Sequence, residues 1–326
     1  MKFRTEVPAP SSTAKITYNS SLLFLGSCFS LNIHNQLQNL KFNSLSNPFG
    51  IVYNPSSISK QISRICQAKE YQESDLHFYN ERWFSFDHHS DFSFASKSDC
   101  LKAINQSLNQ AHQQLKQSNI VFLTLGTAWT YHHNDLKITV SNCHKIPSKT
   151  FCKELTSVTD MVSDLNHSIQ QIRKINPRIQ IVFSISPIRH LSDGFFENQV
   201  SKGRLFDVVH QLLKTENNVN YFPAFEFVMD DLRDYRFYAP DLLHPSTQAI
   251  QYIWNKFQHT FMDDHTLSMT KKIEKLIQAA QHKPFNSKSE AHQKFIYKTL
   301  TEIKKLSIEI NANFQNEIEL LEKSKV

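Results

Sequence analysis

The chain has 326 residues, of which 40% are apolar, and this length allows one large α/β domain or two small ones. Its 36 basic and 30 acidic residues are scattered, which argues against nucleic acid as a partner because nucleic-acid-binding proteins gather lysine and arginine into dense patches. The first residues lack the apolar run of a signal peptide, and no later segment approaches the ~18 apolar residues of a membrane span, so we expect a cytoplasmic protein.

The first half of the chain predicts two buried strands. The apolar run 21–25 ends at Gly26 and leads into a segment with helical spacing of apolar residues. A second apolar run, 120–125, ends at Gly126 and follows a polar helix over about 99–117. Each strand is therefore followed by a tight turn that begins with a glycine.

The second half alternates helices and strands more clearly. A helix is predicted over 157–176, with a serine or threonine cap at its start, and a β-branched strand follows at 179–185. A further helix at 201–214 precedes a strand at 219–222. Pro245 suits the first position of a last helix with a strongly apolar stripe.

This alternation predicts a three-layer αβα fold, doubly wound, with a mostly parallel sheet covered on both faces. Ligands of such sheets bind beyond the carboxyl ends of the strands. We therefore expect four segments to face one crevice: 26–28, 126–127, 186–190 and the residues after Phe222.

Two regions depart from the alternation. Residues 43–98 contain few helical patterns and many aromatic residues, which indicates a loop-rich insertion or a small β excursion over the crevice. Toward the C-terminus, apolar residues at steps of three and four over 296–321 predict an amphipathic helix that docks on the body or on a second copy of the chain. We expect an α/β domain at 1–265 and a helical extension at 266–326.

The five cysteines are odd in number and form no CxxC pair, so neither a disulfide framework nor a zinc ribbon is indicated. Cys143 and His144 lack the paired spacing of a metal site. We expect reduced thiols and neither a metal nor a cofactor.

The turn at 26–28 carries the first candidate for chemistry. A nucleophile between a strand and a helix gains exposure, backbone N–H donors and the positive end of a helix dipole, and both Cys28 and Ser27 occupy that position. Near the other end of the chain Asp241 stands three residues before His244, close enough to orient its ring. An early nucleophile and a late Asp/His pair form a coherent arrangement for acyl transfer.

These residues resemble a known family. Gly26-Ser27-Cys28-Phe29-Ser30 is similar to the motif for which the GSCFA family is named, and the resemblance covers about residues 1–295. Other similar stretches are Asn47-Pro48-Phe49-Gly50, Asn142-Cys143-His144-Lys145, Ser186-Pro187-Ile188-Arg189-His190 and Asp241 to Pro245. The family is grouped with the SGNH/GDSL hydrolases, so the resemblance implies a flavodoxin-like sheet and the cleavage or transfer of acyl groups.

The resemblance also implies roles for individual residues. Cys28 falls on the nucleophilic serine of the superfamily, and Asp241 and His244 match its Asp-x-x-His pair. Ser27, which falls on the aspartate of Gly-Asp-Ser, is the alternative nucleophile. A helix N-terminus and a neighbouring histidine are expected to favour the Cys28 thiolate and to lower its pKa.

The oxyanion hole implied by the resemblance is incomplete. Cys28 and Gly50 match two of its donors, but the segment that begins at Gly126 lacks the asparagine that supplies the third, and losing one donor costs ~10²–10³ in rate. The candidates to replace it are His89, Asn142 and His144. Arg189 and His190 are expected to contact substrate, with Arg189 suited to a carboxylate or phosphate.

Two functions follow. The first is an acyl ester hydrolase or O-acyltransferase with a Cys28 nucleophile, acting on a small-molecule or glycan acyl ester. The alternative is a catalytically inactive module that binds a glycan or an acyl-bearing ligand, which the missing asparagine motivates.

Overall fold

The computed structural model describes residues 5–282, 284–286 and 289–324. At its centre is a parallel sheet with the strand order β10-β9-β5-β1-β2. Its strands are β1 (Ser21–Gly26), β2 (Asn43–Ser46), β5 (Ile120–Leu125), β9 (Gln180–Ile185) and β10 (Val219–Tyr221). In chain order this is the 2-1-3-4-5 arrangement of flavodoxin-like doubly wound folds, which confirms the predicted fold class.

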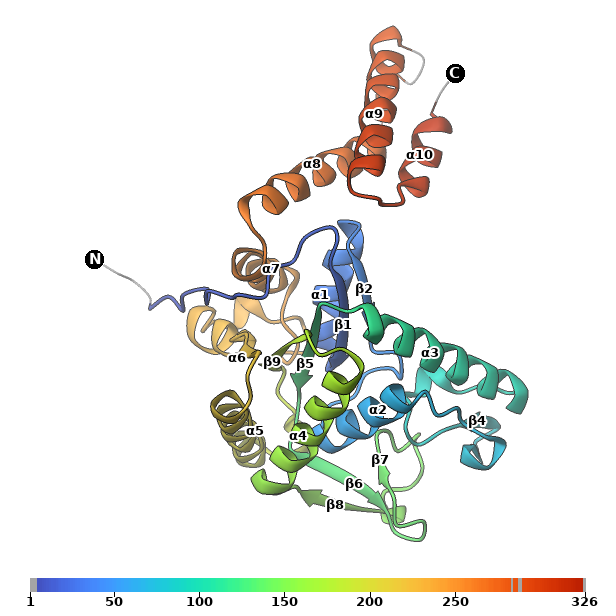
Figure 1. Cartoon of the computed structure of the whole chain (residues 1–326), viewed down its shortest axis with the longest axis vertical. Helices are drawn as coiled ribbons and strands as arrows, with labels where there is room; N and C mark the ends of the chain where they lie inside the picture. The colour runs from blue at the N-terminus through green and yellow to red at the C-terminus, as the bar shows by residue number, and fades with distance from the viewer. Residues whose placement is uncertain (1–4, 283, 287–288, 325–326) are drawn as a thin grey trace.

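Helices cover both faces of this sheet (Figure 1). On β1, Leu22 and Phe24 pack into one apolar cluster, while Leu23 and Leu25 pack into the other, so the strand is apolar throughout because both of its faces are buried. The first cluster includes α1 (Cys28–Asn39) and α7 (Thr247–Phe261). The second includes α2 (Pro55–Gln67), α3 (Lys97–Gln117), α4 (Val158–Ile175) and α5 (Phe195–Thr215). The three predicted layers are confirmed.

Helix capping explains where two predicted helices begin. Helix α4 starts after Ser157, whose side chain accepts a hydrogen bond from Asp160 N, as the sequence predicts. The expected place of Pro245 at the first position of α7 is wrong, because the helix begins one residue after Ser246. The Ser246 hydroxyl caps the helix by accepting a hydrogen bond from Ala249 N, which proline, with no side-chain acceptor, could not do. Pro245 instead forms an isolated β-bridge with Tyr238.

Residues 43–98 hold more regular structure than the expected loop-rich insertion. They supply β2 to the main sheet, helix α2, and the hairpin of β3 (His77–Tyr79) and β4 (Arg82–Phe84). Helix α2 begins at Pro55, after an Asn54 cap, and buries three isoleucines, Ile58, Ile62 and Ile65. Its remaining Ser, Lys, Gln and Arg residues dilute this stripe in the sequence, which is why the helix was not predicted.

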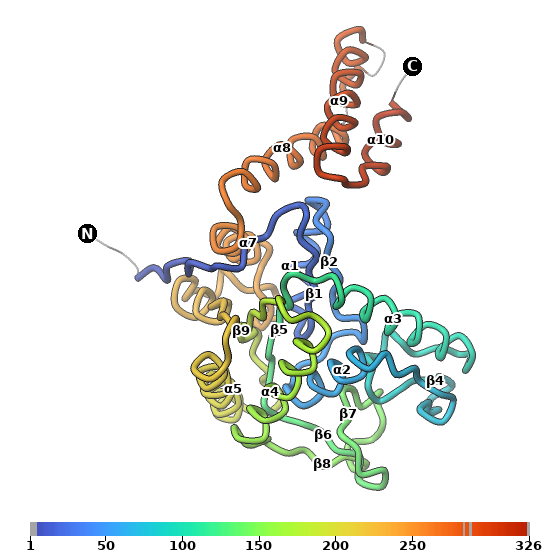
Figure 2. The backbone as a smooth tube through the Cα atoms, viewed as in Figure 1, coloured from blue at the N-terminus to red at the C-terminus, as the bar shows by residue number. Residues whose placement is uncertain are grey.

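A second, antiparallel sheet was not predicted either. It pairs β6 (Trp129–His133) with β7 (Thr139–Val140) and β8 (Phe151–Leu155), and it lies beyond the carboxyl end of β5 (Figure 1). Short helical turns complete the body: Glu73–Asp75, Ser90–Phe92, Ser148–Thr150, Leu191–Asp193, α6 (Ala224–Glu226), Phe227–Asp231 and Tyr235–Phe237. The N-terminal segment runs beside α7 (Figure 2), where Ile16 N donates to Phe261 O at 2.7 Å.

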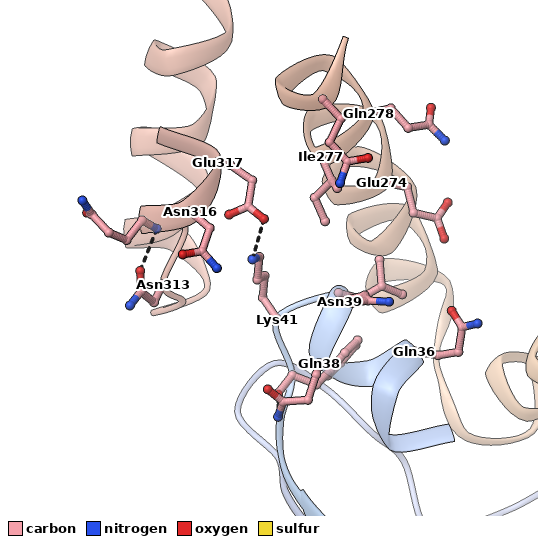
Figure 3. A pocket seen from close by; sticks show the side chains of 14 residues that line it. Gln36, Gln38, Asn39, Lys41, Glu274, Ile277, Gln278, Asn313, Asn316 and Glu317 are labelled. Atoms are coloured by element: carbon pink, nitrogen blue, oxygen red, sulfur yellow. Dashed lines mark hydrogen bonds and ion pairs between the residues drawn. The ribbon is translucent and has the colours of Figure 1, made fainter. Parts of the chain in front are cut away.

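The C-terminal extension consists of α8 (Asp264–Gln281), α9 (Glu290–Glu309) and α10 (Gln315–Glu322). These helices share an apolar cluster with α1, so the extension docks on the body. Lys41, just after α1, forms an ion pair with Glu317 at 2.7 Å (Figure 3). The Lys41 ammonium also lies over the ring of Phe314. None of the helices in the described ranges is both long and apolar enough to cross a bilayer.

The extension lies at the amino end of the sheet, because α1 runs back from the carboxyl end of β1 and Lys41, just after α1, is ion-paired with Glu317 of α10 (Figures 1 and 3). A groove of about 670 Å³ opens there between the body and the extension. Its lining is rich in amides, among them Gln36, Gln38, Asn39, Gln278, Asn313 and Asn316. The groove is therefore remote from the turns in which chemistry is expected.

Candidate active site

The turn after β1 has little conformational freedom. Gly26 has φ +129°, and a Cβ atom on it would lie 2.1 Å from Thr124 O, so only glycine fits. Ser27 is 1% exposed, and its hydroxyl accepts a hydrogen bond from Phe29 N as the cap of α1. Cys28 is the first residue of α1 and is half-buried. The Ser27 side chain thus caps α1.

The loop after β2 holds this turn beside the end of β5. Gly26 N donates to the Asn47 side chain at 2.8 Å, and Val52 N donates to Gly26 O at 3.1 Å. One residue later, Tyr53 O accepts from Gly126 N at 2.7 Å. The turns at Cys28 and Gly126 are therefore fixed relative to each other by a third segment.

Gly50 lies in this same loop, and the structure places His89 against it. Gly50 has φ +79°, and a Cβ atom there would lie 2.2 Å from the Cβ of His89. His89 N donates to Phe49 O at 2.8 Å, and its Nδ1 lies 3.0 Å from Asp91 Oδ2. Gly50 and His89 thus come together beside the loop that borders the Cys28 turn.

Asn142 and His144 belong to a different neighbourhood. The His144 ring stacks on Phe84 at 4.0 Å, and its Nε2 lies 3.1 Å from Ser85 O. Asn142 Oδ1 accepts from His144 N at 2.8 Å and stabilises the turn in which His144 has φ +48°. Their side chains thus serve the local turn and the packing against Phe84, and within the described residues no hydrogen bond or ion pair joins either of them to Cys28.

Asp241 and His244 form the expected pair. His244 Nδ1 lies 2.6 Å from Asp241 Oδ2, and Asp241 Oδ1 accepts from the backbone N–H groups of Leu243 and His244 at 2.9 and 3.0 Å. These backbone bonds, followed by the imidazole, lower the pKa of Asp241 to about 2. Because a carboxylate only accepts, the ring proton is held on Nδ1 and Nε2 is left to take a proton. Both side chains are about half exposed.

Arg189 and His190 lie between this pair and the strand ends. Arg189 donates to Leu242 O at 3.1 Å, so it holds the loop that carries Asp241 and His244. The His190 ring meets Tyr53 edge-on at 5.1 Å, and its Nε2 is buried with no hydrogen-bond partner among the described residues. Burial, then the positive charge of Lys202, lowers the pKa of His190 to about 4. His190 is therefore neutral at pH 7.

The expected effect of the surroundings on Cys28 is wrong in direction. Burial is the largest influence and raises the pKa of the Cys28 thiol, although the N–H groups of Cys28 and Phe29 and the charge of Lys202 oppose it. His244 is not among the charges that act on the sulfur, and no hydrogen bond joins the two side chains within the described residues. The helix N-terminus contributes as expected, but it does not outweigh desolvation.

The structure adds Lys202, which the sequence analysis missed. It is 2% exposed, and its Nζ donates to Gly126 O and to Ser186 O, both at 2.7 Å. The ammonium also lies 5.9 Å from the ring of Phe225, in the segment after β10. Lys202 therefore contacts three of the four segments expected to face one crevice: 126–127, 186–190 and the residues after Phe222. Its positive charge also acts on Cys28, in the fourth segment.

A signal for Lys202 exists in the sequence. Helix α5 buries Lys202 in the same stripe as Leu205, Val209 and Leu212, so a lysine stands where the helical period requires an apolar residue. Burial lowers the pKa of Lys202 to about 7, and the nearby Cys28 acts in the opposite direction. A thiol at a helix N-terminus, an imidazole held by a carboxylate and a buried amine together suit nucleophilic attack on a carbonyl carbon.

Comparison with protein families gives two matches. The model of the GSCFA family matches residues 21–257, and that of the GSCFA domain protein, C-terminal domain, matches residues 273–324. The first spans Cys28, Asp241 and His244, and the second spans most of the helical extension. A search of curated proteins gives no match.

Solved structures give more distant similarities. A carbohydrate esterase family 3 protein from Talaromyces cellulolyticus has 9% identity and a TM-score of 0.35, over 78% of this chain and 99% of the other. A mutant acetyl esterase with an acetate ion has 12% identity and a TM-score of 0.37, over 78% and 99%. A family 3 carbohydrate esterase from Clostridium thermocellum has 13% identity and a TM-score of 0.33, over 77% and 97%. Similarity at this level carries no information about the activity of this chain.

Proposed function

The chain belongs to the GSCFA family, and on that premise we propose that it is an acyl ester hydrolase or O-acyltransferase of the SGNH/GDSL type with Cys28 as its nucleophile. The observation that carries the proposal is the Asp241–His244 pair at 2.6 Å, on a loop that Arg189 ties to the carboxyl edge of the sheet where Cys28 begins α1. Nucleophile, base and orienting carboxylate are the three groups that covalent acyl transfer requires.

The reaction proceeds in two stages. His244 Nε2 takes the thiol proton of Cys28, and the sulfur attacks the ester carbonyl to give a tetrahedral oxyanion. The backbone N–H of Cys28 stabilises that oxyanion, which collapses to an acyl-cysteine as the alcohol leaves with the proton from His244. Gly50 N, the second donor expected from the sequence, instead donates to Asn47 O at 2.7 Å. Water then completes hydrolysis, or a sugar hydroxyl completes transfer, with His244 again acting as base.

His244 has to approach Cys28 for this sequence. Its loop is half exposed and contains Leu242 at φ +58°, and no hydrogen bond in the described residues joins the imidazole to the sulfur. Catalytic hydrogen bonds are often long in unliganded enzymes and tighten when substrate binds. Closure of this loop over the ester is therefore part of the proposed mechanism.

Turnover of p-nitrophenyl acetate and of an acetylated sugar tests the proposal. The wild-type protein should release acetate, and Cys28→Ala should abolish that release. Cys152→Ala is the matched control because Cys152 is the exposed cysteine, and it should retain full activity. Intact mass spectrometry with an activated acyl donor should show one adduct, on Cys28. Equal turnover by Cys28→Ala would reject the nucleophile.

A binding module without catalysis is the second candidate, and the raised pKa of Cys28 favours it. A thiol that stays protonated and lacks a contact with His244 is a poor nucleophile at neutral pH. If Cys28 reacts with iodoacetamide no faster than free cysteine, no ester is cleaved, and an acetylated sugar still binds by calorimetry, this candidate replaces the first.

A further inference from the structure

The groove between the body and the C-terminal extension has the size of a ligand site. Its volume is about 670 Å³, and small-molecule sites usually occupy about 300–1,000 Å³ and often lie where two domains meet. The end of α1 and the residues after it line one side, and α8 and α10 line the other (Figure 3). These two sides belong to the two different family matches, 21–257 and 273–324.

Two of the lining side chains form a nearly buried ion pair. Lys41 Nζ and Glu317 Oε1 lie 2.7 Å apart, and the side chains are only 14% and 10% exposed. Since these two charges neutralise each other, Glu274 is the remaining charged residue of the lining. The groove therefore has no surplus positive charge to attract an anion.

Carboxamides make up most of the remaining lining. Eight of the fourteen lining residues are asparagine or glutamine. Five of these side chains form no hydrogen bond within the part of the chain that the structure describes: Gln36, Asn39, Gln278, Gln281 and Asn316. Their donors and acceptors are available to a ligand.

A neutral ligand with many hydroxyl groups suits this lining. Each carboxamide has two N–H donors and a carbonyl acceptor, so it can bond to neighbouring hydroxyls of a sugar ring that both donate and accept. An acyl chain or an aromatic ring would find little apolar surface, because Leu40 and Phe42 are buried and leave Ile277 as the partly exposed apolar side chain of the lining. The lining thus favours a carbohydrate over an anion or an apolar molecule.

One acceptor in the wall of the groove also lacks a donor. Glu317 Oε1 is paired with Lys41, but Oε2 is buried and has no hydrogen-bond partner among the described residues. A buried carboxylate oxygen without a donor costs free energy. A sugar hydroxyl would supply a donor without adding a charge.

We propose that this groove binds a neutral oligosaccharide. Gln36 of α1, Gln278 of α8 and Asn316 of α10 supply one amide from each of the three helices that line it. The groove lies at the opposite pole of the sheet from Cys28, so a glycan held there leaves the thiol free. The proposal does not require Cys28 to be a nucleophile, and it therefore goes beyond the proposed function.

Calorimetric titration with three unacetylated neutral hexasaccharides, xylohexaose, cellohexaose and maltohexaose, tests the proposal. At least one should bind with a Kd of about 1 mM or below. Gln36→Ala, Gln278→Ala and Asn316→Ala should each weaken binding about two- to tenfold, and the triple variant by more than about tenfold.

The matched control is a triple alanine variant on the outer face of α3. Gln106, Gln110 and Gln113 are also exposed amides, but they lie along a single helix away from the groove. This variant should bind the sugar as the wild type does. All six substitutions are at exposed or half-buried side chains, so the variants should fold, which melting curves check.

Several outcomes would overturn the proposal. These are no binding of any of the three sugars, equal weakening by the α3 control, or equally tight binding of anionic hexagalacturonate. Displacement of the sugar by a capped Gly-Ser peptide would assign the groove to a peptide instead. Cys28→Ala should bind as the wild type does, and binding that is lost in Asp241→Asn but kept in the groove triple variant would place the sugar at the catalytic pair. No ester is present, so failure of ester turnover rejects the proposed function alone.

Discussion

Replacing Asp241 by asparagine should strongly slow catalysis without unfolding the protein. Asp241 Oδ1 accepts from two backbone N–H groups at 2.9 and 3.0 Å, so in Asp241→Asn the amide oxygen has to remain there. The amide NH₂ then faces His244 Nδ1, which becomes an acceptor, and the ring proton moves to Nε2. The imidazole would present a proton where the reaction needs a base.

Loss of general base catalysis typically costs ~10²–10⁴ in rate, so kcat/KM for p-nitrophenyl acetate should fall by that factor. The melting temperature should stay within about 2 °C, since both side chains are half exposed. Asp234→Asn is the matched control: Asp234 is also exposed and accepts from Arg236 N at 2.9 Å, but it has no imidazole partner. Asp241→Asn activity within about threefold of wild type would refute this reasoning.

Three further predictions concern stability. Gly26→Ala should lower the free energy of unfolding by about 3 kcal/mol or more, because Gly26 has a positive φ and a Cβ atom there would clash with Thr124 O. Gly203 lies in a helix and a Cβ atom there would meet no atom within 4 Å, so Gly203→Ala should raise the free energy of unfolding by about 0.5–1 kcal/mol. Urea titration measures both changes. Burial without a partner lowers the pKa of His88 from 6.5 to about 3, so the unfolded chain binds more protons below pH 6.5 and stability falls as pH drops. Between pH 7 and pH 5 the free energy of unfolding should therefore fall by roughly 2 kcal/mol less in His88→Phe than in the wild type. An unchanged pH dependence of stability would contradict this. Phe314→Ala, at a side chain 1% exposed, should cost about 3–5 kcal/mol while leaving Cys28 alkylation unchanged, and exposed Ile308→Ala should cost almost nothing.

The parts of the fold predicted from sequence are those whose signals are local. The run 120–125 is apolar at nearly every position because both of its faces are covered, and Ser157 marks the start of α4 by its own hydrogen bond. The strands of the small sheet were missed because they mix polar and aromatic residues over two to five positions, and their pairing depends on partners elsewhere in the chain. Local pattern does not encode such pairing.

The candidate site divides in the same way. Asp241 and His244 are three residues apart, so their spacing alone predicts the contact that the structure contains. Lys202 bonds to carbonyls 76 and 16 residues away, and only packing brings them together. The pKa of Cys28 could not be predicted either, because burial, the largest influence on it, arises from the whole fold and not from the neighbouring residues.

The last three helices sit at the opposite pole of the sheet from Cys28, with Glu317 anchored to Lys41. A tether attached after α10 would therefore hold the molecule with the end that carries Cys28 facing away from the support. Immobilisation through the extension would thus leave the proposed site open to an ester added in solution.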